Sequence, residues 1–467
     1  MIRFLPKQIA SKAVLIYLGS LAAVTLLFFN HSMSMIYIIM GVVWVLGFFV
    51  LTSFFSRRWM SIPDKRFLVY LGTVSLVLRL VWVIFSYFFY IAQTGEPFEF
   101  NAADSRGYWE DGAWLATEKW SVVLDYLFYS SETVSDSGYY LYLTALYKLI
   151  GPDIILTRVI KSVMGTISVL QIYKVATRNI GEEGGRLAGV MACFMPNLII
   201  YCGLHLKETE MLFLMVAFLE RADYLLRTKK YNVWTIAVPL LLLLSLFTYR
   251  TVLGIAGAFA FISGLIFTTT AIVGRNKRIM LLAWIIVAAV TLTGGSIRNE
   301  VEGMWEEHES NQATKRLSQT LHGNRWAKYA TGTVMAPMMF VLPFPTMVDV
   351  DEQYNQQVLS GGNYVRCFSG GFVLLAVLSA LFVKKNWRDL SFLGAFVFSY
   401  LGIISMSGFS NSERFLLPGL PVLLIMTAYG ITLLNARNYR YIKTWYWIVP
   451  LMIVGWAVFK LGSRGLI

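Results

Sequence analysis

The first candidate for chemistry is an acidic position close after an apolar run. Asp104 lies beyond the apolar residues 67–92, and Tyr108 and Asp111 follow it at about one and two turns of a helix. A helix that starts at Ser105 would use Asp104 as its N-cap, which is one interpretation of this carboxylate. The other is a general base that accepts the proton of an attacking hydroxyl.

A second acidic pair opens an apolar run further along the chain. Glu208 and Glu210 stand at the start of this run, directly after His205 and Lys207. The helix dipole favours carboxylates in a first helical turn, which would explain the pair without any function. His205, Lys207, Glu208 and Glu210 within six residues are nevertheless more ionisable groups than a cap requires.

Two arginines stand at the opposite end of their apolar runs from most other basic residues. Arg250 separates two apolar runs in the sequence LFTYRTVL, and Arg414 precedes another in SNSERFLLP. A guanidinium group presents a fork of donors that suits phosphate, so both residues are candidates to bind an anionic substrate. The alternative is a structural pair with a carboxylate, for example between Arg414 and the neighbours of Glu413.

The sequence has no motif for a cofactor, a metalloprotease or a serine hydrolase. It lacks GxGxxG, Walker A, HExxH and CxxC patterns and a nucleophile elbow in a fitting context, and its four histidines are scattered. The three cysteines are expected to be small buried hydrophobic residues, so we infer neither disulfides nor a metal cluster. A divalent metal is neither required nor excluded. These residues are His31, His205, His308, His322, Cys193, Cys202 and Cys367.

The elements that must position these residues are membrane-spanning helices. Hydrophobic residues make up 57% of the chain and charged residues 14%, with a mean hydropathy of +0.60. Apolar runs close to the roughly 20 residues that cross a bilayer recur along the whole length. The sequence therefore predicts an all-α polytopic membrane protein with about thirteen spans, near 13–29, 34–55, 67–92, 153–176, 185–202, 206–226, 233–249, 251–273, 279–295, 363–383, 389–408, 415–434 and 444–462.

The net charge of +13 is concentrated in alternate connections between these spans, which argues against nucleic acid as a partner. The positive-inside rule assigns those connections to the cytoplasm. The two long segments, 93–152 and 296–362, and the chemistry then lie outside. We interpret the N-terminus as a retained signal anchor, and thirteen spans would put the C-terminus outside. The basic connections carry Arg57, Arg58, Lys65, Arg66, Lys174, Arg178, Arg186, Arg227, Lys229, Lys230, Arg275, Lys277, Arg278, Lys384, Lys385, Arg388, Arg437, Arg440 and Lys443.

The two outer segments have different characters. In the first, residues from Tyr139 to Ile150 are too short and amphipathic to span, which predicts a helix at the interface. The second has an acidic stretch at 300–309 and a basic patch at 315–328. An apolar stretch, Gly332–Val348, then carries three prolines, which favour a broken or re-entrant helix.

The order of these features resembles the GT-C superfamily of membrane glycosyltransferases, above all the protein O-mannosyltransferases and the lipid A aminoarabinose transferases. The resemblance covers 67–250. Its motifs are Asp-x-x-x-Tyr from Asp104, YYLY from Tyr139 to Tyr142 with LIGP ending at Pro152, Arg158, Pro196, Glu208, and the late RFLLPGLP from Arg414 to Pro421. Many relatives carry two adjacent acids where this chain has Asp104 and Ser105, and the first two spans look like an addition.

The predicted units are a hairpin (1–66), a catalytic core (67–295), the second outer segment (296–362) and C-terminal helices (363–467).

The resemblance implies a polyprenyl-phosphate sugar donor and a lipid, glycan or protein acceptor, among the lipids of a bacterial inner membrane. Asp104 would be the base, Arg250 and Arg414 the phosphate clamp, with Lys207, Glu208, Glu210, Tyr108 and Asp111 as further substrate-binding residues. Direct displacement would invert the anomeric centre of the sugar. The alternatives are a transporter or flippase of lipid-linked glycans, a surface polysaccharide polymerase or ligase, and a non-catalytic component of a polysaccharide assembly complex.

Overall fold

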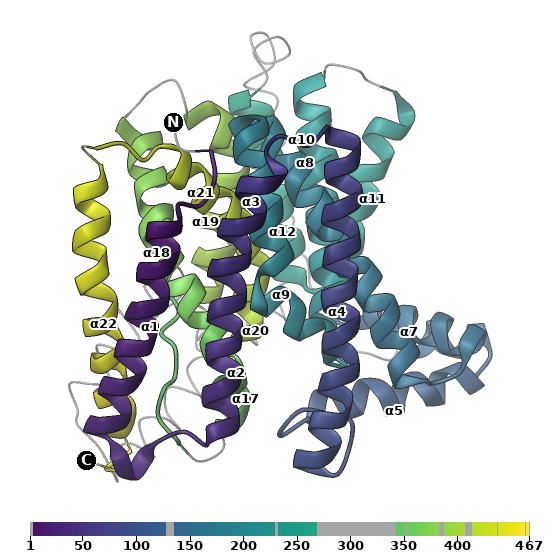
Figure 1. Cartoon of the computed structure of the whole chain (residues 1–467). Coiled ribbons are helices and arrows are strands. Elements are labelled where there is room, and N and C mark those ends of the chain that lie inside the picture. Colours follow the sequence, from purple (N-terminus) through teal and green to yellow (C-terminus); the bar gives the residue numbers. More distant parts are fainter. Residues whose placement is uncertain are drawn as a thin grey trace.

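The fold is a bundle of helices in a computed structural model (Figure 1). The structure describes residues 3–127, 135–228, 232–268, 342–350, 353–382, 387–406, 413–436, 438–462 and 464–466. Its longer helices are α1 (Lys7–Leu27), α2 (Met35–Leu46), α3 (Thr52–Trp59), α4 (Asp64–Thr94), α5 (Ala103–Thr117), α7 (Ser137–Ile150), α8 (Ile154–Phe194), α10 (Glu208–Thr228), α11 (Val233–Tyr249), α12 (Thr251–Thr268), α18 (Ser360–Phe382), α19 (Trp387–Met406), α21 (Leu420–Thr432) and α22 (Tyr439–Gly462). Shorter helices are α6 (Trp120–Asp125), α9 (Pro196–Ile200), α17 (Tyr354–Val358) and α20 (Glu413–Leu416).

The chain is an integral membrane protein of the all-α class. Seven described helical segments are long and apolar enough to cross a membrane, and three shorter apolar helices accompany them. Each predicted span falls on a described helix except 279–295, which lies outside the described residues, as do the acidic stretch 300–309 and the basic patch 315–328. The predicted hairpin 1–66 consists of α1 and of α2 continued into α3 through one π-helical turn.

Helix α8 is two antiparallel arms. Its 41 residues would extend over about 60 Å as one straight helix, about twice the thickness of a bilayer core. Gly181 breaks the helix with φ 82° and ψ 168°, a conformation that glycine adopts without strain. Beyond this residue the chain turns back, so that Gly185 lies against Thr177 and Gly189 against Tyr173. The predicted spans 153–176 and 185–202 correspond to these two arms, the second continued by α9.

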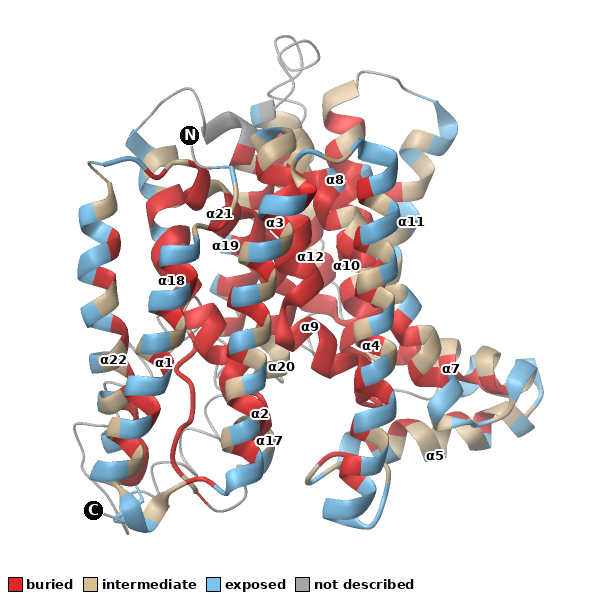
Figure 2. Ribbon diagram, viewed as in Figure 1, coloured by how far each residue is buried: buried red, intermediate tan, exposed pale blue. Residues whose placement is uncertain are grey.

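The buried centre of the bundle is formed by α8, α9, α10 and α21, and α8 packs against α4, α10 and α21 (Figure 2). Of the apolar stretch formed by α21 and the residues that lead into it, 89% is buried in the bundle. The buried share of the apolar stretch is 33% in α4 and 33% in α22. On α4 the exposed residues Val77, Val81, Ile84 and Phe88 recur at helical spacing and form one apolar face. A face of this kind is stable against lipid tails and not against water.

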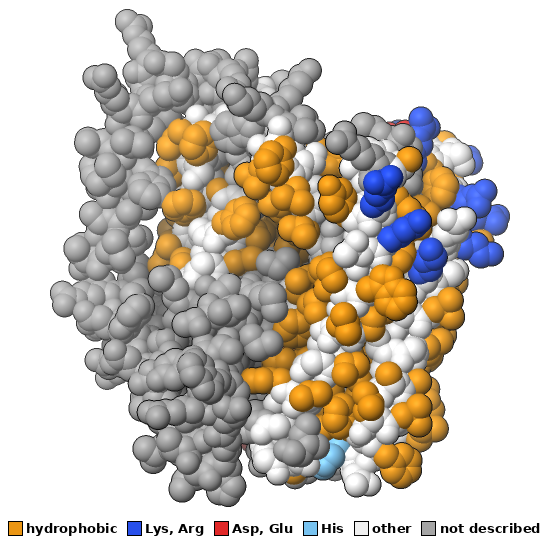
Figure 3. All heavy atoms as spheres, turned by 90° about the vertical axis from the view of Figure 1, so that its left-hand side faces the viewer, with side chains coloured by type: hydrophobic (Ala, Val, Ile, Leu, Met, Phe, Trp, Pro, Cys, Tyr) orange, Lys and Arg blue, Asp and Glu red, His pale blue; other side chains and the backbone are white. Residues whose placement is uncertain are grey.

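The two ends of the bundle differ in charge and in structure. The start of the chain lies at one end, and α5 and α7 lie toward the other, where the chain also finishes (Figure 1). Figure 3 shows Lys and Arg side chains gathered toward one end of a face that is otherwise largely apolar. The two ends of the chain thus lie at opposite ends of the bundle (Figure 1), while the number of spans and an outer C-terminus stay predictions.

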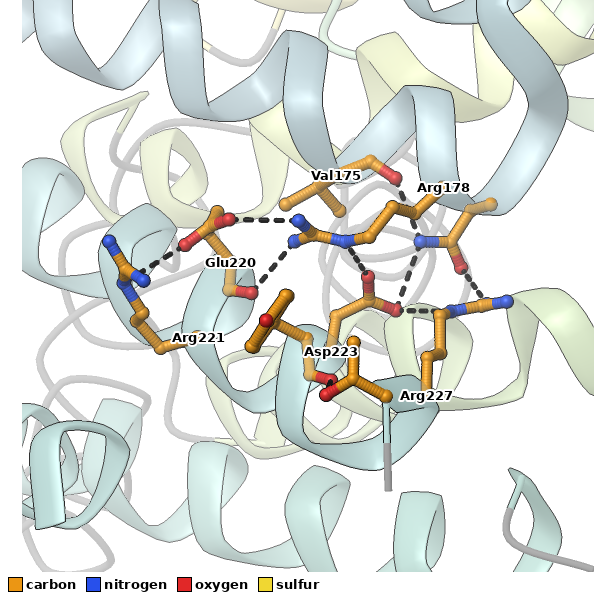
Figure 4. Close-up of polar contacts among 9 residues, drawn as sticks. Val175, Arg178, Glu220, Arg221, Asp223 and Arg227 are labelled. Carbon is orange, nitrogen blue, oxygen red and sulfur yellow. Dashed lines mark hydrogen bonds and ion pairs between the residues drawn. The ribbon is translucent and has the colours of Figure 1, made fainter. Parts of the chain in front are cut away.

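An ion-pair network joins α8 to α10 near the turn at Gly181 (Figure 4). Arg178 Nε lies 2.7 Å from Asp223 Oδ2, and Arg178 Nη1 lies 2.9 Å from Glu220 Oε1. Arg227 Nε donates to the second oxygen of Asp223 at 2.9 Å, and Asn179 donates to the same oxygen at 3.1 Å. The network fixes one end of α10 against α8, and the other end of α10 carries Glu208 and Glu210.

The described end of the second outer segment is extended. Residues 342–350 are not helical, and Val348 forms an isolated antiparallel bridge with Ser32. Most of the predicted broken or re-entrant helix in Gly332–Val348 lies outside the described residues, and its described end is extended because Pro343 and Pro345 fix φ and donate no backbone hydrogen bond. The predicted interfacial helix from Tyr139 to Ile150 is α7, which packs against α5.

Candidate functional site

Asp104 lies in the first turn of α5 and not at its N-cap. The helix begins at Ala103, after Asn101, which has the left-handed φ of 52°. Asparagine tolerates this conformation better than most residues. The chain therefore enters the helix two residues earlier than predicted, and the N-cap interpretation of Asp104 is wrong. Its carboxylate is instead available for contacts with other segments.

Arg414 joins the two predicted acidic positions. Its Nη1 donates a hydrogen bond of 2.5 Å to Asp104 Oδ2, and its Nε lies 3.2 Å from Glu208 Oε1. This arginine belongs to the one-turn helix α20, far from both acids in the sequence. The expected alternative, a structural pair between an arginine and a carboxylate, agrees with these contacts, although the partners of Arg414 are Asp104 and Glu208 and not the neighbours of Glu413. Glu413 itself faces Arg366 on α18, at 3.5 Å.

Glu208 is a fully buried carboxylate between two guanidinium groups. Arg250 Nη2 lies 3.8 Å from the same Glu208 oxygen that Arg414 approaches. No hydrogen bond to either Glu208 oxygen is found among the described residues, so the two arginines balance its charge at ion-pair distance. Phe415 lies under both guanidinium groups, 4.2 Å from Arg250 and 5.6 Å from Arg414. Contacts of a guanidinium group with an aromatic ring are favourable, so Phe415 helps to hold both arginines in place.

Lys207 lies on the other side of this centre, where a residue that the sequence analysis missed contacts it. Lys207 forms an ion pair with Asp136, and its Nζ also donates to the Tyr249 carbonyl at 3.2 Å. The Tyr108 hydroxyl donates to the other oxygen of Asp136 at 2.7 Å. Asp136 has a φ of 74°, so it is strained as well as charged. Only its place in the acidic first segment could have pointed to it.

Tyr108 is a permanent hydrogen-bond donor in this arrangement. Burial raises the pKa of its phenol, and the nearby charge of Glu208 raises that pKa further. The phenol therefore stays protonated at neutral pH and donates to Asp136. Tyr108 positions Asp136, and through it Lys207.

Two predicted substrate-binding residues lie apart from this centre. Glu210 faces Lys161 of α8 at 3.2 Å, and both side chains are almost completely buried. Asp111 accepts a hydrogen bond of 3.2 Å from Tyr140 on α7. These contacts hold α10 to α8 and α5 to α7, so the structure gives both residues positioning roles.

The site is partly open. The side chains of Asp104 and Arg414 keep 52% and 26% of their surfaces exposed, whereas that of Glu208 has none. An entering anion would therefore meet Arg414 first, with Arg250 behind it. We call Asp104, Glu208, Arg250 and Arg414 the charge centre. Among the described residues no group of three or more His, Cys, Asp or Glu side chains could hold a metal ion.

No protein-family model matches the chain, and no curated protein is significantly similar to it.

Proposed function

We propose that this protein is a membrane glycosyltransferase of the GT-C type. It crosses a bacterial inner membrane about thirteen times and transfers a sugar from a polyprenyl phosphate to an acceptor hydroxyl at the extracytoplasmic face. The observation that carries the proposal is the charge centre, which brings together four segments far apart in the sequence. The exposed carboxylate of Asp104 contacts Arg414, and the buried carboxylate of Glu208 lies between Arg414 and Arg250. A base beside a pair of phosphate-binding groups is what transfer from a sugar phosphate requires.

The reaction balances with these residues alone. Asp104 takes the proton of the acceptor hydroxyl, while the oxygen of that hydroxyl forms a bond to the anomeric carbon. The bond from that carbon to the phosphate oxygen breaks, and the electron pair leaves on the polyprenyl phosphate. Arg250 and Arg414 stabilise the negative charge that grows on this leaving group. A single displacement of this kind inverts the anomeric centre.

The position of the charge centre also bears on the rival functions. A transporter binds its cargo near the middle of the membrane, between two repeated halves. The charge centre instead involves the first turn of α5, the start of α10 and the connection between α11 and α12, toward the end of the bundle that carries α5 and α7 (Figure 1). A site for chemistry at the membrane surface fits this position better.

The test is transfer of a radiolabelled sugar. Membranes that contain the chain would be supplied with a polyprenyl phosphate carrying a labelled hexose or pentose, and incorporation into lipid, glycan and protein fractions would be counted. We expect label in one fraction, in proportion to the amount of the chain. Movement of intact donor across the membrane without any transfer would support a flippase and overturn the proposal.

A further inference from the structure

A cavity of about 700 Å³ lies where α4 leads into α5. Its walls are the end of α4, the loop from α4 to α5, the first turn of α5, and one residue of α17. Asn355 of α17 donates a hydrogen bond of 2.6 Å to the Phe100 carbonyl, which joins α17 to this loop. The lining residues are Gln93, Thr94, Glu96, Phe98, Glu99, Phe100, Asn101, Ala102, Ala103, Arg106 and Tyr354.

The cavity combines aromatic rings with polar groups. The rings of Phe100 and Tyr354 lie 5.1 Å apart, and Tyr37 stacks on Tyr354 from behind at 6.3 Å. The amide of Asn101 stands next to Phe100, exposed, on a backbone held at positive φ. A sugar has apolar C–H faces that pack on rings and hydroxyl groups that need donors and acceptors. This lining provides both.

Glu99 gives the cavity an unused hydrogen-bonding group. Only 8% of this residue is exposed, and its Oε1 accepts a hydrogen bond of 2.5 Å from Ser105. Its Oε2 has no partner among the described residues. Buried polar atoms are nearly always hydrogen-bonded, so this oxygen is an exception, and a small rotation of the side chain would be needed to turn it to a ligand. Burial also raises the pKa of Glu99, which favours a neutral carboxyl that can donate to a hydroxyl.

The charged residues that line the cavity do not favour binding of the phosphate group of the sugar donor. Arg106 is the one cation among the lining residues, and it is paired with Glu96. The cavity therefore suits a neutral molecule, whereas Arg250 and Arg414 suit an anion. Ala103 and Arg106 line the cavity from the first turn of α5, and Asp104 belongs to the same turn. Asp104 itself does not line the cavity, so this turn of α5 is the link between the cavity and the charge centre.

We propose that this cavity binds the acceptor, and that the acceptor is a saccharide whose attacking hydroxyl meets Asp104. The inference rests on the proposed glycosyl transfer. Tyr354 and Phe100 pack on the sugar ring, and Glu99 and Asn101 bond to its hydroxyl groups. The acceptor is therefore the sugar portion of a glycan or glycolipid and not a protein side chain.

Saturation-transfer NMR tests the cavity directly. The full-length chain would be placed in nanodiscs, because maltoside detergents carry sugar head groups of their own. The probes are the methyl glycosides of glucose, galactose, mannose and N-acetylglucosamine. We expect saturable binding of at least one probe, weakened roughly tenfold in Tyr354→Ala and retained in Tyr354→Phe, which keeps the ring. Asn101→Gly, which preserves the backbone at positive φ, should also weaken binding.

The same samples separate this inference from the proposed function. Binding of polyprenyl phosphate should be unchanged in all three cavity variants and reduced in Arg414→Gln. If no glycoside binds, or if Tyr354→Ala and Asn101→Gly both bind like wild type with normal unfolding temperatures, the acceptor cavity is wrong while sugar transfer can stand. If glycoside binding is weakened in Tyr354→Ala and Asn101→Gly and retained in Tyr354→Phe, but no sugar is ever transferred, the cavity stands as a saccharide site and the transferase proposal fails.

Discussion

Asp104 and Arg414 are 310 residues apart in the sequence, yet Asp104 Oδ2 accepts a hydrogen bond of 2.5 Å from Arg414 Nη1. The candidate base is thus held by one of the two candidate phosphate-binding groups. A phosphate that binds Arg414 competes with Asp104 for the same donors, and the carboxylate it displaces becomes free to accept a proton. Arrival of the donor would then prepare the base, which would discourage proton transfer before the sugar is in place.

Loss of Arg250 should weaken donor binding and also destabilise the fold, and the two effects can be separated. Arg250→Gln removes one charge-assisted contact to phosphate, worth about 1.5 to 3 kcal/mol, or roughly ten- to 150-fold in Kd. It also leaves the buried Glu208 carboxylate with one arginine. The double variant Arg250→Gln with Glu208→Gln should recover the unfolding temperature but not the affinity, as measured with labelled polyprenyl phosphate. Wild-type affinity in Arg250→Gln would make this arginine purely structural.

The buried pair of Lys161 and Glu210 should stabilise the fold and not bind substrate. Lys161→Met leaves a buried carboxylate unpaired, which costs about 3 to 5 kcal/mol. Replacing both residues by methionine removes both charges, so most of the lost stability should return. Thermal unfolding of the purified protein measures this, with donor affinity as the control. If Glu210→Gln unfolds like wild type but loses donor affinity, Glu210 belongs to the substrate site after all.

Hydropathy was enough to find the helices, because the length of an apolar run and the thickness of a bilayer are both sequence-level quantities. It also placed a turn between the predicted spans 153–176 and 185–202, but it could not show that one glycine at positive φ, Gly181, makes this turn between two arms that pack tightly. Nor could it predict the start of α5. The left-handed Asn101 moves that start by two residues and changes Asp104 from a cap into a partner of Arg414.

The candidate site shows the same limit. The residue types at Glu208, Arg250 and Arg414 pointed to charge chemistry, and the structure brings these three together with Asp104. Helix packing decides which side chains a given acid contacts, and the sequence does not show this packing. Glu210 and Asp111 were predicted to bind substrate, and in the structure they contact Lys161 and Tyr140. Asp136 carries no spacing signal at all.

The sidedness of the membrane can be measured by cysteine labelling on intact cells. Glu110 and Lys65 are both exposed, on α5 and near the start of α4, toward opposite ends of the bundle (Figure 1). A membrane-impermeant maleimide should label Glu110→Cys at once and Lys65→Cys only after the cells are permeabilised. The three native cysteines are buried, so the background should be low. Strong labelling of Lys65→Cys on intact cells would reverse the orientation and overturn an extracytoplasmic site.

The role of Asp104 can be decided by a substitution that changes its basicity and little else. Asn has nearly the shape of Asp and still accepts a hydrogen bond from Arg414, but it cannot take up the proton of a hydroxyl. A general base contributes about a hundredfold to ten-thousandfold in rate, so Asp104→Asn should abolish nearly all transfer. The ion pair is half exposed, so its loss should change stability by no more than about 1 kcal/mol.

The control for this experiment is Asp111→Asn, in the same helix. Asp111 contacts Tyr140 and stands outside the charge centre, so its variant should keep both donor affinity and most of the transfer rate. Donor affinity in Asp104→Asn should be equal to that of wild type or higher, because a neutral amide competes with phosphate for Arg414 less strongly than a carboxylate does. Turnover of Asp104→Asn close to the wild-type rate would show that Asp104 only positions Arg414, and the base would then have to be sought at Glu208.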